Sequence, residues 1–275
     1  MAEFNSALRC LILVAATCAA FVSPPARAQS DTTIPPAVSG EPRWQAIASF
    51  YYSNSKQGYD GNGDRIDIAD YRKLELYLLT EYRVSDDVTL VLTPSLREVS
   101  VEGPDNDSSG LGYTDVGARY RFAEGDGWSL AAQGTVRIPG DTRPDVLAQI
   151  GSTDAEYDAR LRGIYGFASG SDSGFVDIQG AYRLRDGDPP NEFHLDVTAG
   201  YRPVETLLVM AQSFNTFSDG DGRGIFNRYR YHNAQLSAVY DVAPGLSLQA
   251  GWLGTLGGEN ALRERGAFGG VWISF

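Results

Sequence analysis

The sequence has few cysteines and histidines and no long apolar run beyond its start. Its two cysteines, Cys10 and Cys18, lie near the N-terminus, and only two histidines occur among 275 residues. No run of 18 apolar residues follows the first 28, which argues against a transmembrane helix. So few cysteines exclude a disulfide framework. The net charge of −12 argues against a nucleic-acid partner, which would select a basic surface.

Residues 1–28 are typical of a secretory signal peptide. Arg9 provides a basic flank, a 13-residue apolar core follows, and Ala26-Arg27-Ala28 matches a cleavage site. Both cysteines lie inside this segment, so we expect the processed chain to lack thiol chemistry. Residues 29–42 are polar and rich in proline, and we interpret them as a periplasmic N-terminal segment preceding a domain of residues 43–275.

Between Asp154 and Arg202 the sequence alternates strictly between apolar and polar residues in three runs. In the first run one face is small and apolar with aromatic ends, and the other face is charged. The apolar face holds Ala155, Tyr157, Ala159, Leu161, Gly163, Tyr165 and Phe167. Two further runs, 176–185 and 193–202, follow the same rule. A period of two predicts β-strands, because successive side chains point to opposite sides.

The position of the aromatic residues favours a transmembrane barrel over a soluble β-sandwich. Tyr157, Tyr182 and Phe193 fall at one end of the three runs, and Tyr165, Phe167 and Tyr201 fall at the other. Once the strand tilt is allowed for, Tyr157 and Tyr165 differ in height by about 20 Å along the barrel axis, close to the height of an outer-membrane barrel between its aromatic girdles. The sequence therefore predicts an all-β fold, a transmembrane antiparallel up-and-down β-barrel.

The same alternation predicts twelve strands, an even number as single-chain bacterial barrels have. They are 44–54, 70–83, 88–101, 113–122, 128–138, 154–167, 176–185, 193–202, 205–217, 228–242, 246–255 and 265–275. Short and long connections mostly alternate, with 168–175 as an exception. Because short turns face the periplasm, we expect both termini to lie on the periplasmic side of a Gram-negative outer membrane.

The chain ends in an alternating strand that closes with Phe275. A terminal aromatic residue of this kind resembles the signal that the outer-membrane assembly machinery recognises. We therefore expect that machinery as a partner, together with outer-membrane lipid and lipopolysaccharide.

A pattern in the first half of the chain resembles a known family. Ser109-Gly110-Leu111-Gly112-Tyr113-Thr114-Asp115 is followed by Gly117-Ala118-Arg119-Tyr120-Arg121-Phe122, and the next strand ends in Ile138-Pro139-Gly140. The pattern is similar to outer-membrane proteins of the MetA pathway of phenol degradation, also called transporters. This resemblance implies passage of a small solute, aromatic or hydrophobic, and assigns no catalytic residue.

Charged residues dominate the predicted inner face of the middle strands. We predict that a solute path is lined by Arg119, Arg121, Arg137, Asp158, Arg160, Arg162, Asp177, Arg183, Arg185 and Asp196. Such charges can line a translocation path. They can equally brace a narrow barrel through ion pairs, since buried charges must be paired. Both interpretations stay open on the sequence alone.

Sequence features that suggest catalysis or metal binding are weak. His194 and His232 lie in no familiar Ser–His arrangement. Asp60-Gly61-Asn62-Gly63-Asp64 begins like a calcium loop, but Arg65 follows where glycine is needed. We therefore predict a channel or transporter without cofactor or metal. A non-conducting structural barrel is the first alternative, and a lipid-modifying enzyme is the second.

Pro94 interrupts the third predicted strand. A proline removes one ladder donor and usually marks a bulge, which Ser95 or Arg97 could compensate from the lumen. In hydrocarbon an unpartnered carbonyl is costly. The alternative hypothesis is a gap in the wall at Pro94 through which an apolar solute leaves sideways into the membrane.

Overall fold

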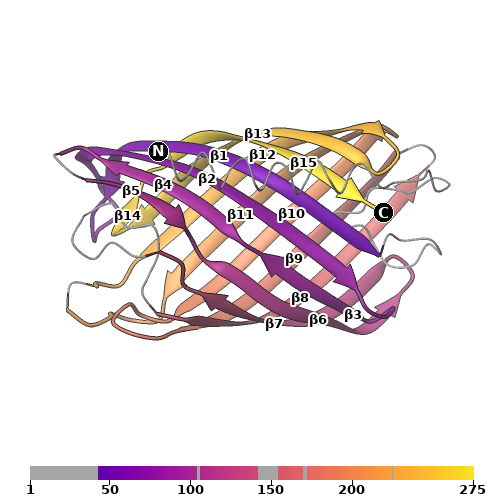
Figure 1. Cartoon of the computed structure of the whole chain (residues 1–275), viewed down its shortest axis with the longest axis horizontal. Helices are drawn as coiled ribbons and strands as arrows, with labels where there is room; N and C mark the ends of the chain where they lie inside the picture. The colour runs from indigo at the N-terminus through magenta and orange to yellow at the C-terminus, as the bar shows by residue number, and fades with distance from the viewer. Residues whose placement is uncertain (1–42, 104–105, 142–153, 170–171, 225) are drawn as a thin grey trace.

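The computed structural model describes residues 43–103, 106–141, 154–169, 172–224 and 226–275. The predicted signal peptide and the segment 29–42 lie outside these residues. Within the described ranges the chain forms 15 strand segments joined in one antiparallel sheet that closes on itself (Figure 1). The same ranges contain no helix long and apolar enough to cross a membrane.

The strand segments have the following bounds. They are β1 (Trp44–Tyr59), β2 (Arg65–Arg83), β3 (Val88–Thr93), β4 (Ser95–Val101), β5 (Asp107–Leu111), β6 (Thr114–Gly125), β7 (Trp128–Ile138), β8 (Glu156–Ser169), β9 (Asp172–Arg185), β10 (Glu192–Val204), β11 (Leu207–Ser218), β12 (Arg230–Ala243), β13 (Leu246–Glu259), β14 (Ala261–Leu262) and β15 (Arg265–Ser274).

In the described part of the chain these 15 segments make the twelve strands of a closed barrel. Three strands are each interrupted once, between β3 and β4, between β5 and β6, and between β14 and β15. The barrel closes because β1 pairs with β2 on one side and with β15 on the other. The predicted fold class and strand number are confirmed.

The two ends of the barrel differ. One end, the C-terminal rim, carries Phe275, the start of β1 and short turns such as residues 84–87; in Figure 1 the label C marks it. The other end, the loop rim, carries longer connections such as residues 186–191. At the C-terminal rim the backbone of Trp44 exchanges hydrogen bonds of 2.9 and 3.1 Å with Phe275, which fixes the final residue into the wall.

The outer wall exposes large apolar side chains around the barrel. Leu161 is 62% exposed, Leu236 57% and Tyr165 56%, far more than water-facing surfaces carry in one continuous band. The predicted aromatic ends are present on neighbouring strands: Tyr182 packs against Phe193 with ring centroids 4.7 Å apart. This surface is the one that a lipid environment requires of a barrel.

Several strands are longer than the sequence predicted, and the connections are shorter. The segment 168–175, expected as a long break, belongs mostly to β8 and β9, whose ends pair from Ser169 to Asp172. Similarly, β1 and β2 run on as a paired ribbon to Tyr59 and Arg65. The expected bounds were wrong because polar strands can keep their ladder bonds beyond the apolar band, where the alternation that marks strands fades.

An apolar cluster crosses the lumen near the C-terminal rim. Six inward side chains form it, each between 0 and 7% exposed: Ile47, Phe175, Leu208, Met210, Val239 and Trp272. Its members on β1 and β9 belong to strands six places apart in the sheet order, which are opposite walls of the barrel. The cluster therefore fills one side of the lumen with dry, packed side chains.

Candidate functional site: an arginine-lined cavity in the lumen

A cavity of about 390 Å³ lies inside the barrel beside the apolar cluster. Its walls come from β1 to β3 and from β6 to β9, and Leu79 contacts both the cavity and the cluster. Six arginines line it: Arg83, Arg119, Arg137, Arg160, Arg162 and Arg183. Their common orientation follows from the alternation of the strands, which sends every second residue into the lumen.

Two of the carboxylates that pair with these arginines lie deeper in the wall than the arginines do. The side chain of Asp177 is 1% exposed and that of Asp158 is 5%, whereas their partners Arg162 and Arg160 are 11 and 14% exposed. Arg162 donates from Nε and Nη2 to the same Asp177 oxygen, at 2.9 and 2.8 Å. These two negative charges are thus set behind their arginines, whereas Glu81 and Asp115, which also line the cavity, are more exposed than their partners Arg119 and Arg137.

Arg119 and Arg160 show how tightly some pairs are closed. Arg119 binds both oxygens of Glu81 through two bonds of 2.9 and 2.7 Å, the planar pairing that guanidinium favours. Arg160 Nη1 donates to Asp196 at 2.6 Å and to Gln179 at 3.0 Å. Arg119 is thus held by a partner on β2, and Arg160 by partners on β9 and β10.

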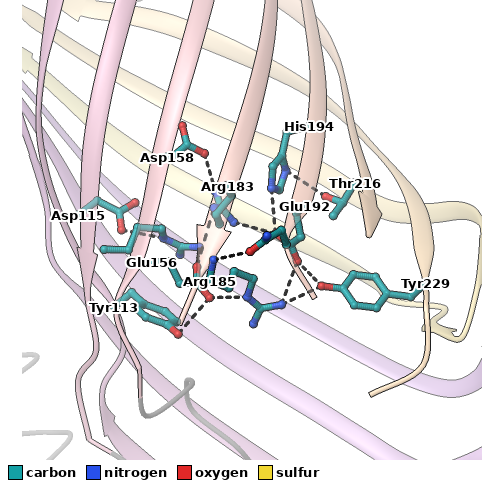
Figure 2. Close-up of polar contacts among 12 residues, drawn as sticks. Tyr113, Asp115, Glu156, Asp158, Arg183, Arg185, Glu192, His194, Thr216 and Tyr229 are labelled. Atoms are coloured by element: carbon teal, nitrogen blue, oxygen red, sulfur yellow. Dashed lines mark hydrogen bonds and ion pairs between the residues drawn. The ribbon is translucent and has the colours of Figure 1, made fainter. Parts of the chain in front are cut away.

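Toward the loop rim the charges join a wider network, drawn in Figure 2. Glu156 accepts hydrogen bonds from Arg137 at 2.9 Å and from Arg185 at 2.8 Å, and from the hydroxyl of Tyr113 at 3.2 Å. Its side chain is 3% exposed. Its three hydrogen-bond donors come from β7, from β9 and from the connection between β5 and β6. Glu156 therefore holds neighbouring parts of the wall together.

Glu192 is the second centre of the same network (Figure 2). Arg183 and Arg185 each donate to it at 3.2 Å, and the hydroxyl of Tyr229 donates to it as well. Tyr229 precedes β12, outside the membrane-spanning strands. Burial and the Glu192 carboxylate raise the pKa of Tyr229 above its ordinary range, so the phenol stays a donor.

The predicted path residues separate into three groups. Arg119, Arg137, Asp158, Arg160, Arg162 and Arg183 line the cavity. Asp177, Arg185 and Asp196 are their partners or neighbours in the ion-pair network. Arg121 lies at the C-terminal rim, where it contacts Asp87 at 3.4 Å and Glu124 at 2.9 Å.

A smaller cavity of about 100 Å³ adjoins the first one at this rim. It shares Arg83, Arg119 and Arg162 with the larger cavity and is lined as well by Asp86 of the turn after β2. The charged lining therefore continues from the middle of the lumen to the C-terminal rim, alongside the apolar cluster.

Partner choice was the part of the site that sequence reasoning missed. The bond of Glu81 to Arg119 joins β2 to β6, which β3 separates. Tyr229 reaches Glu192 only in the folded chain. No local signal identifies such pairs, because they connect positions 38 and 37 residues apart.

The two histidines lie apart from the cavity lining. His194 faces the lumen between Glu192 at 2.9 Å and Thr216 at 3.2 Å. Hydroxyl, imidazole and carboxylate are the groups that nucleophilic hydrolases use. Here Thr216 is only 4% exposed and Glu192 is already shared by two arginines, so the three residues fit a structural bridge. His232 bonds to Asn215 at 2.8 Å.

The sequence stretch that resembled a calcium loop forms a tight turn. Asp60 Oδ1 accepts the backbone N–H groups of Asn62 at 2.8 Å and of Asp64 at 2.9 Å. In the described ranges no group of three or more His, Cys, Asp and Glu is placed to hold a metal ion.

Pro94 lies at the interruption between β3 and β4, where the pairing with the neighbouring strand shifts register. Ser95 Oγ donates to the carbonyl of Tyr113 at 2.8 Å, and Gly112 N donates to the carbonyl of Ser95 at 3.0 Å. On the other side Leu78 N donates to the Pro94 carbonyl at 3.1 Å. The bulge is thus bridged on both sides.

Solved structures with a similar fold include outer-membrane channels. The COG4313 outer membrane channel from Pseudomonas putida F1 superposes with a TM-score of 0.71 at 17% identity, covering 90% of this chain and 100% of that one. The KdgM porin in complex with disordered oligogalacturonate gives a TM-score of 0.49 at 13% identity over 84% of this chain and 99% of its own. At these identities the likeness concerns the fold.

A search of curated proteins found no match. The profile of one family matches residues 75–275, from the middle of β2 to the last residue, and so includes every arginine that lines the cavity. The chain belongs to the family described as "Putative MetA-pathway of phenol degradation".

Proposed function

We propose that this protein is an outer-membrane channel that passes small molecules, aromatic or hydrophobic ones among them, through the arginine-lined side of its lumen. The observation that carries the proposal is a charged cavity inside a closed barrel with a continuous apolar outer wall. Pores are built in this way, with a polar interior and a lipid-facing surface. The family description supports an aromatic solute.

The proposal also places the chain in the membrane. The barrel stands in the outer membrane of a Gram-negative cell, in contact with lipid and lipopolysaccharide, with both termini on the periplasmic side. Phe275, at the rim of the closed wall, serves the assembly machinery during insertion. Phe275→Ala is then expected to lower the inserted fraction in cells while purified protein still refolds, and unchanged insertion would remove this role.

A second candidate function is a non-conducting structural barrel. The apolar cluster favours it, since side chains from opposite walls meet there and leave one side of the lumen closed. The ion pairs favour it too, because an arginine held by two carboxylates braces the wall as well as it lines a path.

Single-channel recording in planar bilayers separates the two functions. A channel gives discrete current steps, whereas a filled barrel gives none above the membrane background. Arg160→Ala and Arg183→Ala refine the result: along a path they lower anion preference, and in a brace they lower heat resistance on gels without changing ion selectivity. Absence of steps for correctly folded protein would contradict the proposed function.

A lateral route at Pro94 is a further part of the proposal. An apolar solute that leaves the lumen at the interrupted strand would avoid the charged lining beyond it. The position is marked by a one-residue shift in register from the β3–β6 pairing to the β4–β5 pairing, which interrupts the strand although hydrogen bonds bridge it on both sides.

A further inference from the structure

The cavity presents two chemically different surfaces to one solute. Arginines supply the positive surface, while Leu79, Val91 and Ile164 supply apolar side chains. The two kinds alternate closely on β8, where Arg160, Arg162 and Ile164 point inward in succession. Neighbouring inward residues of a strand lie about 7 Å apart, comparable to the length of a single-ring acid.

Two guanidinium groups of the lining have donors that no protein acceptor uses. Within the described residues, both bonds of Arg162 come from Nε and Nη2, and Nη1 is left for another acceptor. Arg183 Nε is buried without a hydrogen bond, and Glu156 Oε2 lies 3.8 Å from it. Because Arg183 Nε is closed off in the wall, the donor that an incoming acceptor can reach is Nη1 of Arg162, a residue of the cavity lining.

Charge and shape together narrow the class of solute. A cation would face six arginines against the three lining carboxylates of Glu81, Asp115 and Asp158, and a neutral ring would bury guanidinium groups without satisfying their donors. A small inorganic anion would leave the apolar surface unused. A carboxylate on an apolar ring satisfies both surfaces, because the carboxylate matches guanidinium geometry and the ring covers aliphatic side chains.

We infer that the cavity binds small organic monocarboxylates with an apolar body, with the carboxylate at Arg162 and the ring against Ile164 and Leu79. The inference deepens the proposed function, and it names the solute class of the same site. It requires binding at this cavity, which can be measured on the purified barrel whether or not the protein conducts.

The test compares three single-ring probes of similar size and one short acid on the full-length barrel in detergent by titration calorimetry. Benzoate carries both features, benzyl alcohol lacks the charge, benzylamine reverses it, and acetate lacks the ring. We expect benzoate to bind at least about tenfold more tightly than each of the others, as one charge-assisted hydrogen bond allows. Equal affinity for benzoate and benzyl alcohol, or no benzoate binding, would overturn the inference.

Variants locate the site. Arg162→Gln alone would leave the buried Asp177 carboxylate without its positive partner. The informative protein is therefore the double variant Arg162→Gln, Asp177→Asn, which keeps a neutral pair in the wall. It should lose about tenfold in benzoate affinity. The matched control is Arg202→Gln with Asp241→Asn, an inward pair bonded at 2.8 Å outside the cavity lining, which should bind benzoate like the parent. Equal loss in both double variants would refute the assignment.

A third variant tests the apolar half of the site. Ile164→Ser should weaken benzoate about threefold, from the apolar area lost, and leave acetate unchanged. Conductance is recorded in parallel, so that the two proposals fail separately. Current steps without a preference for benzoate would refute only the proposed solute class. Benzoate binding without current steps would refute only the proposed channel function.

Discussion

Among substitutions that exchange one oxygen for nitrogen, Glu156→Gln is expected to lower the unfolding free energy of the barrel most. The Glu156 carboxylate accepts from Arg137, Arg185 and Tyr113 at 2.8 to 3.2 Å in a site where its side chain is 3% exposed. Glutamine keeps the shape of the side chain, but it removes the negative charge and places an amide NH2 donor against guanidinium donors. The change therefore isolates the electrostatic part of the network.

The size of the expected stability loss depends on which carboxylates Arg137 and Arg185 still contact after the substitution. Removing one partner of a buried pair costs about 3–5 kcal/mol. Here Arg137 keeps Asp115 at 2.9 Å and Arg185 keeps Glu192 at 3.2 Å, so neither is left without a carboxylate. We therefore expect a loss near the lower limit, about 3 kcal/mol of unfolding free energy.

The assay is urea unfolding of the barrel reconstituted in lipid vesicles, followed by fluorescence of its four tryptophans. The midpoint should fall while the slope with denaturant stays constant, which shows that stability changed and the exposed surface did not. Glu124→Gln is the control, because that carboxylate pairs with Arg121 but is 48% exposed. Its pair should contribute about 0–1 kcal/mol.

A loss below about 1 kcal/mol for Glu156→Gln, or one equal to that of Glu124→Gln, would refute the view that buried ion pairs brace this wall. A double replacement separates charge from packing. Exchanging Glu156 and Arg185 together for apolar residues removes both partners, and it should cost less than the glutamine alone if the cause is the positive charge of Arg185 losing one of its two carboxylates.

The remaining predictions concern the lumen, the orientation and the interrupted strand. Phe175→Ala should cost about 3–5 kcal/mol and raise single-channel conductance, because its ring, 3% exposed, belongs to the cluster that crosses the lumen; equal conductance would show that the cluster is no barrier. A cysteine at Asp221 should react with an impermeant reagent on intact cells and one at Asp86 should not; labelling at Asp86 would reverse the orientation. Pro94→Val should slow uptake of a hydrophobic aromatic with ion conductance unchanged, and undiminished uptake in an inserted protein would exclude a lateral exit there.

The sequence by itself determined the fold and the inward direction of the charges. Strict alternation in strands such as β8 places Arg160 and Arg162 on one face and Leu161 on the other, since the side-chain period of a strand is two. Hydrocarbon outside and polar groups inside are the only arrangement that such strands allow in a membrane. Strand number, aromatic ends and the inner position of the arginines follow from that local rule.

Only the tertiary structure decided which charges meet and where the lumen is filled. Arg119 pairs with Glu81 two strands away, and Phe175 meets Ile47 within one cluster from the opposite wall. Such contacts depend on barrel radius, tilt and register, which set distances across the lumen and leave no trace in the local alternation. For the same reason the cavity, its apolar side and the unused donor of Arg162 emerge only when the sheet closes.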